Sequence, residues 1–355
     1  MNPPLLMIGS AAYNSADETF RAWGPTLAPH LGALPDGEVQ DRRLWIQRLY
    51  YQVFNGHPDL EVLRRPAPID GAEQPLPRKR EEAFRFRVKP GVDKLKFGLP
   101  GWRLGYAKDA INSYNLFRAL KELKILPQHT RFQVSIPTPN SACNPAVFED
   151  SGLRAAQQGY LDATFAEVEN ICAQIPHDEL AIQWDSSWEV TDVYGGTSLP
   201  VEGALDRNLD QYGRLSEAVP AGVQLGIHLC FGTFGGWPRF APDDLGAAVD
   251  LSNGIIEVSR HGLEWIHIPT LDTVDPAFYA PLANLKLKGA KVYLGMIHSF
   301  DTFEARLEVA RRFLPDFGLA AYCGFGRLTR EEMDQIVDDH LKALQIAGFA
   351  NVQPD

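Results

Sequence analysis

Apolar and polar positions along the chain follow two different periods. Eight short apolar segments, each ending in polar or turn residues, have the length and composition of buried β-strands. Between many of them, apolar residues recur every three or four positions, which is the spacing of one face of an α-helix. The eight predicted strands cover residues 5–10, 33–38, 131–138, 180–185, 224–230, 263–270, 291–299 and 317–323.

The alternation of strands with helices predicts a parallel sheet, and eight such strands predict a (β/α)8 barrel. A doubly wound sheet is the competing architecture. The barrel is favoured because polar residues stand at the C-terminal end of nearly every predicted strand, where the active sites of such barrels are built. We therefore expect an α/β fold, a (β/α)8 TIM barrel that forms a single domain over residues 1–355.

The interval between the second and third predicted strands is longer than an ordinary connection in such a barrel. Within it, residues 84–89 alternate between apolar and polar, Pro90 and Gly91 predict a turn, and residues 92–97 predict a returning strand. Residues 107–123 have a helical pattern. We expect residues from about 50 to 128 to form a β-hairpin and a helix over the barrel mouth, with a purely structural flap as the alternative.

Three residues at the ends of two predicted strands suggest a metal site. His228 and Cys230 are two positions apart, so their side chains point to the same side of a strand, and Cys323 ends the last strand. One imidazole and two thiolates could bind zinc and leave one coordination position open for a substrate. Each residue could instead fill the core, because free cysteine is among the most often buried residue types.

The composition narrows the class of protein. With 45% hydrophobic and 22% charged residues, the 355-residue chain is typical of a soluble globular protein, and its net charge of −11 makes a nucleic-acid partner unexpected. No apolar run reaches the ~20 residues of a membrane span. We expect a cytoplasmic protein, because the N-terminus lacks the features of a signal peptide and the four cysteines form no disulfide framework. Motifs that bind ATP or NAD are absent, so neither cofactor is implied. Zinc is the cofactor we expect, because of the His228, Cys230 and Cys323 set.

Six segments, in the right order along the chain, resemble the superfamily of cobalamin-independent methionine synthase and uroporphyrinogen decarboxylase. The closest resemblance is to the catalytic barrel of the synthase. The segments are Ile8-Gly-Ser10, Asp36-Gly-Glu38, Ile182-Gln-Trp-Asp185, His228-Leu-Cys230, Ile297-His-Ser299 and Cys323-Gly324. The resemblance implies a methyltransferase-class enzyme that transfers an alkyl or methyl group to a small thiol, with zinc bound by His228, Cys230 and Cys323.

The same resemblance assigns further roles. Glu38 and Asp185 would orient the cationic part of the thiol substrate, and His298 would donate a proton. Ser10 and Trp184, which lie in two of the segments, are further candidates for substrate binding. In the synthases a glutamate at the end of the sixth strand is the remaining zinc ligand, but Pro269 stands at that position here.

His267 lies one pleat before Pro269 on the same face, and is a candidate for the fourth zinc ligand. A buried structural histidine is the alternative.

Two other functions stay open. One is a metal-free enzyme of the decarboxylase type, in which Asp185 and Arg327 would bind a carboxylated substrate. The other is a zinc hydrolase or lyase that acts on a carboxylated or aromatic small molecule, with water in the open metal position. The partners we expect are a small thiol and an alkyl donor, whose identities the sequence leaves open, and homo-oligomers are compatible with it.

Overall fold

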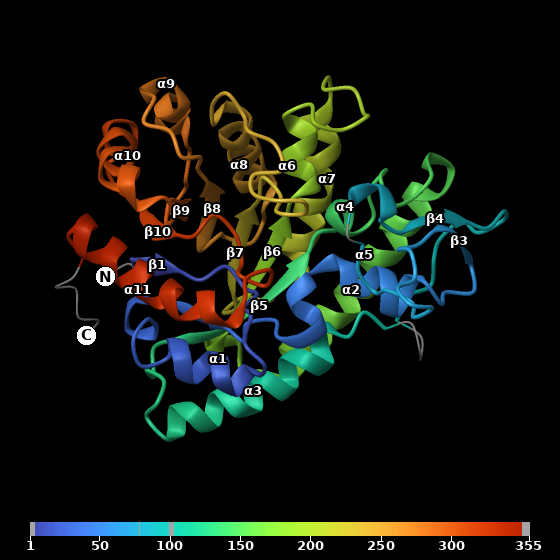
Figure 1. The fold of residues 1–355 in the computed structure, drawn as a ribbon, viewed down its shortest axis with the longest axis horizontal. Helices are drawn as coiled ribbons and strands as arrows, with labels where there is room; N and C mark the ends of the chain where they lie inside the picture. The colour runs from blue at the N-terminus through green and yellow to red at the C-terminus, as the bar shows by residue number, and fades with distance from the viewer. Residues whose placement is uncertain (1–3, 78, 99–102, 350–355) are drawn as a thin grey trace.

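The computed structural model describes residues 4–77, 79–98 and 103–349. Eight parallel strands form one sheet that curls into a barrel, with helices around it (Figure 1). Each strand coincides with one of the eight predicted segments, and only β6 extends past its segment, by one residue, so the predicted TIM barrel is confirmed. The strands are β1 (Leu5–Leu6), β2 (Ala33–Pro35), β5 (Arg131–Pro137), β6 (Leu180–Ser186), β7 (Gln224–Leu229), β8 (Trp265–Pro269), β9 (Lys291–Gly295) and β10 (Gly318–Ala320).

The barrel closes between its first two strands. β1 pairs with β10 on one side, and a parallel bridge joins Leu5 to Leu31, just before β2, on the other. Inside the barrel, the carbonyl oxygen of Ile8 accepts hydrogen bonds from Gln133 Nε2 (2.9 Å) and Gln183 Nε2 (2.7 Å). These buried amides therefore tie β5 and β6 to the end of β1, and satisfy a carbonyl that water cannot reach.

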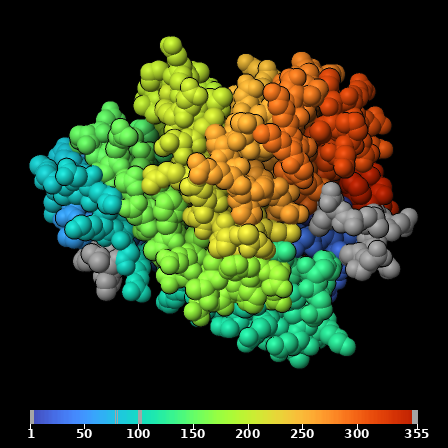
Figure 2. All heavy atoms as spheres, turned by 180° about the vertical axis from the view of Figure 1, so that it is seen from behind, coloured from blue at the N-terminus to red at the C-terminus, as the bar shows by residue number. Residues whose placement is uncertain are grey.

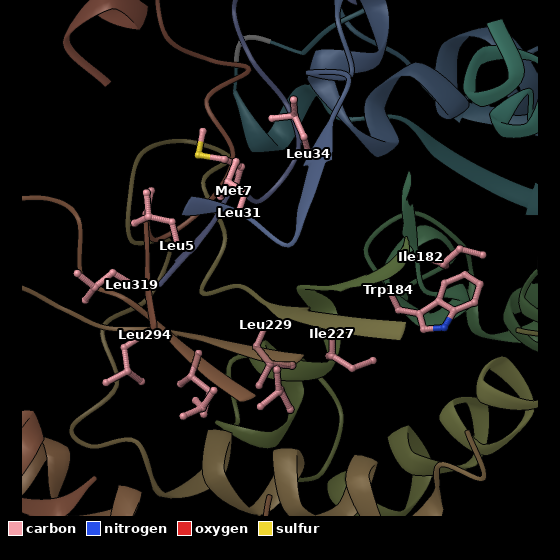
Figure 3. Packing of buried hydrophobic residues seen from close by; sticks show 14 of the residues in the cluster. Leu5, Met7, Leu31, Leu34, Ile182, Trp184, Ile227, Leu229, Leu294 and Leu319 are labelled. Carbon is pink, nitrogen blue, oxygen red and sulfur yellow. The ribbon is translucent and has the colours of Figure 1, made fainter. Parts of the chain in front are cut away.

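The main hydrophobic core lies between the outer face of the strands and the helices. Outward-facing residues such as Ile182, Ile227 and Leu294 are buried in this layer (Figure 3). The longer helices are α1 (Ala16–Trp23), α3 (Tyr106–Glu122), α5 (Asp150–Gln174), α7 (Ala204–Glu217), α8 (Gly246–Val258), α10 (Phe300–Phe313) and α11 (Arg330–Ala347). The short ones are α2 (Ile46–Leu49), α4 (Pro139–Ala142), α6 (Trp188–Val193) and α9 (Pro276–Tyr279). Among the described residues, no helix has both the length and the apolar character needed to cross a membrane.

The insertion contains a two-stranded sheet, but not the hairpin that the sequence predicts. β4 (Arg85–Val88) lies within the predicted residues 84–89, yet its antiparallel partner is β3 (Leu60–Arg64). Residues 92–97 form no strand, which corrects the prediction. The reason is that the other edge of β4 is already occupied, since Phe86 N donates to Val147 O (2.7 Å). Residues 92–97 run along α5 instead, where Leu95 N donates to Ala155 O (3.2 Å).

The predicted helix of the insertion is α3, but it packs outside the barrel beside α1 and α5 (Figure 1). The rest of the insertion lies next to the mouth. Its buried residues form a second, smaller hydrophobic core together with residues of α4 and α5. In this core the ring of Phe54 lies 5.0 Å from that of Phe97 and 5.7 Å from that of Phe148. Figure 2 shows the insertion, in cyan, against the green residues that follow β5.

Gly226 is a position at which the interior of the barrel requires glycine. Gly226 of β7 faces the indole ring of Trp265, and a Cβ atom at this position would lie 1.8 Å from Trp265 Cε2. We expect Gly226→Ala to lower the free energy of unfolding by about 1–3 kcal/mol, the usual cost of overpacking a core. Urea denaturation measures this change. Gly262→Ala is the control, because a Cβ atom there meets nothing within 4 Å; equal losses in the two variants would contradict the argument.

Candidate metal centre and substrate cavity

Barrel closure brings the two cysteines together. Cys230 follows β7 and Cys323 follows β10, and the sheet order places β8 and β9 between these strands. In a flat sheet, strands three positions apart would be separated by roughly 14 Å. In the closed barrel, Cys230 Sγ lies 3.4 Å from Cys323 Sγ, and Cys323 Sγ lies 3.8 Å from His228 Nε2. The three ligand atoms all lie within 4.8 Å of one another.

These distances fit a zinc ion. Tetrahedral zinc with ordinary bond lengths separates two sulfur ligands by about 3.8 Å, and a sulfur from a nitrogen ligand by about 3.6 Å. The observed distances of 3.4 and 3.8 Å differ from these by a few tenths of an ångström. Two thiols and one imidazole are also the soft ligands that zinc prefers. The predicted ligands His228, Cys230 and Cys323 therefore lie close enough together to hold one metal ion.

The two thiols differ in their ease of ionisation. Cys230 donates a hydrogen bond to Cys323 Sγ, which lowers the pKa of the Cys323 thiol well below its usual range. The same hydrogen bond, together with burial, raises the pKa of Cys230. The backbone N–H of Gly232 donates to Cys230 Sγ at 3.2 Å. A thiolate is therefore favoured at Cys323, and a metal ion would stabilise the second one.

His267 lies beside the three ligands but is not grouped with them. Its Nδ1 lies 2.8 Å from Nδ1 of His228, and its Nε2 lies 3.0 Å from the carbonyl oxygen of Ala321. A carbonyl only accepts, so we assign the proton of His267 to Nε2. Its Nδ1 then accepts the Nδ1–H of His228, which leaves His228 Nε2 with a free lone pair toward Cys323.

The fourth ligand that the sequence suggested is therefore absent from the cluster. Burial lowers the pKa of His267 well below its usual range. Its Nδ1 contacts His228 and the carbonyl oxygen of Leu229, and its Nε2 contacts the carbonyl oxygen of Ala321, so neither ring nitrogen points to the two cysteines without another partner. Pro269, which ends β8, supplies no ligand either. The contact of His267 with His228 would let it orient that ring, a role common beside metal-bound histidines.

A cavity of about 210 Å³ opens beside the cluster, and three of the predicted substrate-binding residues line it: Ser10, Glu38 and Asp185. Burial raises the pKa of Glu38 to about 8, although the charge of Arg42 opposes this rise. Burial and the nearby Glu38 raise the pKa of Asp185 well above its usual range. A cationic group bound between the two carboxyls would stabilise their ionised forms.

Ser10 also forms hydrogen bonds with the loop that follows β10. Its carbonyl oxygen accepts from Phe325 N (2.6 Å), and its hydroxyl oxygen accepts from Gly326 N (3.3 Å). These bonds hold the loop that carries Cys323 against the end of β1. A Cβ atom at Gly324 would lie 2.4 Å from Ser10 Oγ, so the loop can approach this closely only with glycine at that position.

Two predicted residues do not line the cavity. Trp184 is buried on the outer face of β6, beside Ile182 in the layer between strands and helices (Figure 3). Neighbouring residues of a strand point to opposite faces, so Asp185 faces the barrel interior while Trp184 faces away from it.

The second of these residues is His298. Its ring packs edge-on against that of Tyr322, with 5.7 Å between the centroids. Its Nε2 lies 3.0 Å from Thr270 O and 3.2 Å from Arg306 Nη1, and its Nδ1 lies 3.3 Å from Ser299 Oγ. Burial and the charge of Arg306 lower its pKa to about 4, so at neutral pH it holds no extra proton to donate.

Sequence reasoning missed the cavity wall that the segment after β2 and the insertion supply. This wall consists of Arg43, Trp45, Ile46, Gln47, Tyr50, Arg64 and Ala83. The adjacency of arginines and a tryptophan at residues 42–45 was the available signal, but nothing in the sequence alone directs this segment toward the barrel mouth.

We compared the sequence and the structure with those of known proteins. No protein-family model matches the sequence, and a search of curated proteins found no match. Solved structures do match, and two of them are described here. One, from Listeria monocytogenes, is described as a vitamin-B12-independent methionine synthase; it is 14% identical, the match covers 94% of this chain and 86% of that one, and the TM-score is 0.54. The other is a methyltransferase from Methanosarcina mazei, with 11% identity, coverage of 96% and 93%, and a TM-score of 0.50.

This chain has their fold. The resemblance stated from the sequence is therefore confirmed at the level of the fold. At such low sequence identity, structural similarity shows the fold alone. The chemistry must be argued from the residues of this cavity.

The orienting role of His267 leads to a prediction about metal affinity. We expect His267→Ala to bind zinc about 10–100-fold more weakly than the wild type, because His228 loses the partner that fixes its tautomer. Competition with a zinc chelator measures the affinity. His340→Ala, which removes another buried histidine, is the control. Complete loss of zinc would make His267 a direct ligand, and unchanged affinity would remove the orienting role.

Proposed function

We propose that this protein transfers an alkyl group, methyl in the simplest case, to a small thiol with the help of zinc. The observation that carries the proposal is the meeting of His228, Cys230 and Cys323 at the mouth of a barrel that has the fold of methyltransferase structures. The ligand set and its spacing suit zinc with one position open to a substrate. The cavity beside the cluster has room for a small molecule.

Zinc bound there would lower the pKa of a coordinated thiol, so that a thiolate is available at neutral pH. The chain supplies the other requirements. Glu38 and Asp185 line the same cavity and would bind a cationic part of the thiol substrate. In the transfer, the thiol proton passes to solvent and a bond forms between sulfur and the alkyl carbon. The bond from that carbon to the leaving group breaks, and the leaving group departs with the electron pair.

The binding of zinc can be measured directly. We expect about one zinc per chain in wild-type protein purified without a histidine tag, and almost none in Cys230→Ser, because a hydroxyl is a poor substitute for a thiolate ligand. Cys172→Ser is the matched control, since Cys172 is a free cysteine on α5 outside the cluster. Near-zero zinc in all three proteins would end the zinc proposal and favour the metal-free decarboxylase alternative.

The role of His298 can be tested by turnover. A general acid contributes ~10²–10⁴-fold, so a proton donor at this position would lose that much activity in His298→Ala. The contacts of His298 with Thr270, Arg306 and Ser299 lead us to expect a loss of less than about tenfold, with zinc retained. The assay pairs homocysteine, glutathione or coenzyme M with methyl and epoxide donors. A loss in the range of a general acid would restore the role of proton donor to His298.

The same assay separates the alternatives. Turnover that requires a thiol supports the transferase. Turnover of a carboxylated or aromatic compound in the absence of any thiol would instead support the zinc hydrolase or lyase.

A further inference from the structure

Four arginines surround the cavity. Arg43 belongs to the 3-10 turn after β2, Arg64 ends β3, Arg239 lies in the loop after β7, and Arg327 lies in the loop after β10. The chain as a whole has a net charge of −11, so a cluster of four positive side chains is unusual for it. The two acids that line the cavity, Glu38 and Asp185, lie at the ends of barrel strands.

Most of these arginines form no ion pair with a carboxylate of the described residues. Nearby, Arg42 pairs with Asp36 at 2.7 Å and Arg48 with Asp109 at 3.7 Å. Three of the four cavity arginines, Arg43, Arg64 and Arg327, differ from these two. In the described part of the chain, no carboxylate lies within ion-pairing distance of them.

Neutral oxygens hold two of these guanidinium groups in place. Arg64 Nε donates to the carbonyl oxygen of Ala83 at 2.7 Å, and Arg327 Nη1 donates to Thr233 Oγ1 at 2.6 Å. A hydrogen bond to a neutral oxygen fixes the direction of the side chain but leaves its charge uncompensated. Each guanidinium also retains further N–H donors for a ligand.

The walls between the arginines and the cluster are largely apolar. Trp45, Ile46, Trp188 and Phe234 line the cavity, and the guanidinium of Arg239 lies 5.9 Å from the centre of the Trp188 ring. Guanidinium groups bind carboxylate and phosphate through paired hydrogen bonds. The cavity therefore combines a site for an anionic head group with a surface for an apolar or aromatic body.

We propose that the alkyl donor is a small apolar or aromatic acid whose anionic head group binds Arg64 and Arg327. Its body lies against Trp45 and Trp188, in the same cavity as Cys230 and Cys323. The inference rests on the proposed function in taking this cavity as the substrate site and its anionic ligand as the alkyl donor. It adds the class of the second substrate, which neither the fold nor the metal ligands specify.

Benzoate and its neutral analogue benzamide test the proposal, with binding measured by calorimetry and tryptophan fluorescence. We expect wild-type protein to bind benzoate at least about tenfold more tightly than benzamide, because only benzoate has a charge for the arginines. Arg64→Gln and Arg327→Gln should each weaken benzoate binding by about tenfold and leave benzamide binding unchanged. Arg65→Gln is the matched control, since its exposed side chain pairs with Glu73 at 3.0 Å and does not line the cavity. Equal affinity for benzoate and benzamide would overturn the proposal.

A metal ion can also bind carboxylates, so the measurement is repeated with the double variant Cys230→Ser, Cys323→Ser. We expect the preference for benzoate to persist there, because the arginines do not depend on the cluster. Loss of benzoate binding in this variant, with unchanged binding in both arginine variants, would place the anion at the metal and overturn the proposal. Anion binding without any zinc in the wild type would instead refute only the zinc-dependent function. Phenyl phosphate and benzenesulfonate, measured in parallel, identify the preferred head group.

Discussion

The site depends on the closure of the barrel. Cys230 and Cys323 are three strands apart in the sheet, and only a closed ring of strands lets their sulfur atoms meet at 3.4 Å. The pairing of β1 with β10 and the bridge from Leu5 to Leu31 complete that ring. Ser10, just beyond β1, then holds the loop that carries Cys323. A ligand that binds both cysteines binds the folded barrel alone, and so stabilises it against unfolding.

The register of neighbouring strands decides which side chains reach the cavity. Asp185 pairs with His228, and His228 with His267, so the three residues stand at one level of β6, β7 and β8. A shift of one residue would turn all three toward the helices. The same alternation keeps Trp184 in the outer layer, although its place in the sequence beside Asp185 suggested a role at the cavity.

The sequence predicts the barrel well, because each strand is buried on both faces and appears as an apolar run with a polar residue at its end. The three candidate zinc ligands follow from the same pattern. The position of His298 does not, because β9 ends at Gly295 and the backbone at Ser299 is left-handed (φ 49°), so strand alternation no longer applies. The pairing of β4 and the arginines around the cavity also depend on contacts between segments far apart in the chain, which local pattern cannot supply.

The distribution of charge in the cavity would order the two proposed substrates. The carboxyls of Glu38 and Asp185 stand at the ends of barrel strands, and arginines such as Arg64 stand on the loops and the insertion. Under the proposals above, a cationic thiol would bind beside the carboxyls and an anionic donor beside the arginines. The reverse arrangement would bring like charges together, and the unfavourable contacts would reject it. The insertion adds Arg64 to the wall of a cavity that Glu38, Asp185 and the candidate metal ligands also line, so groups of opposite charge face the same space.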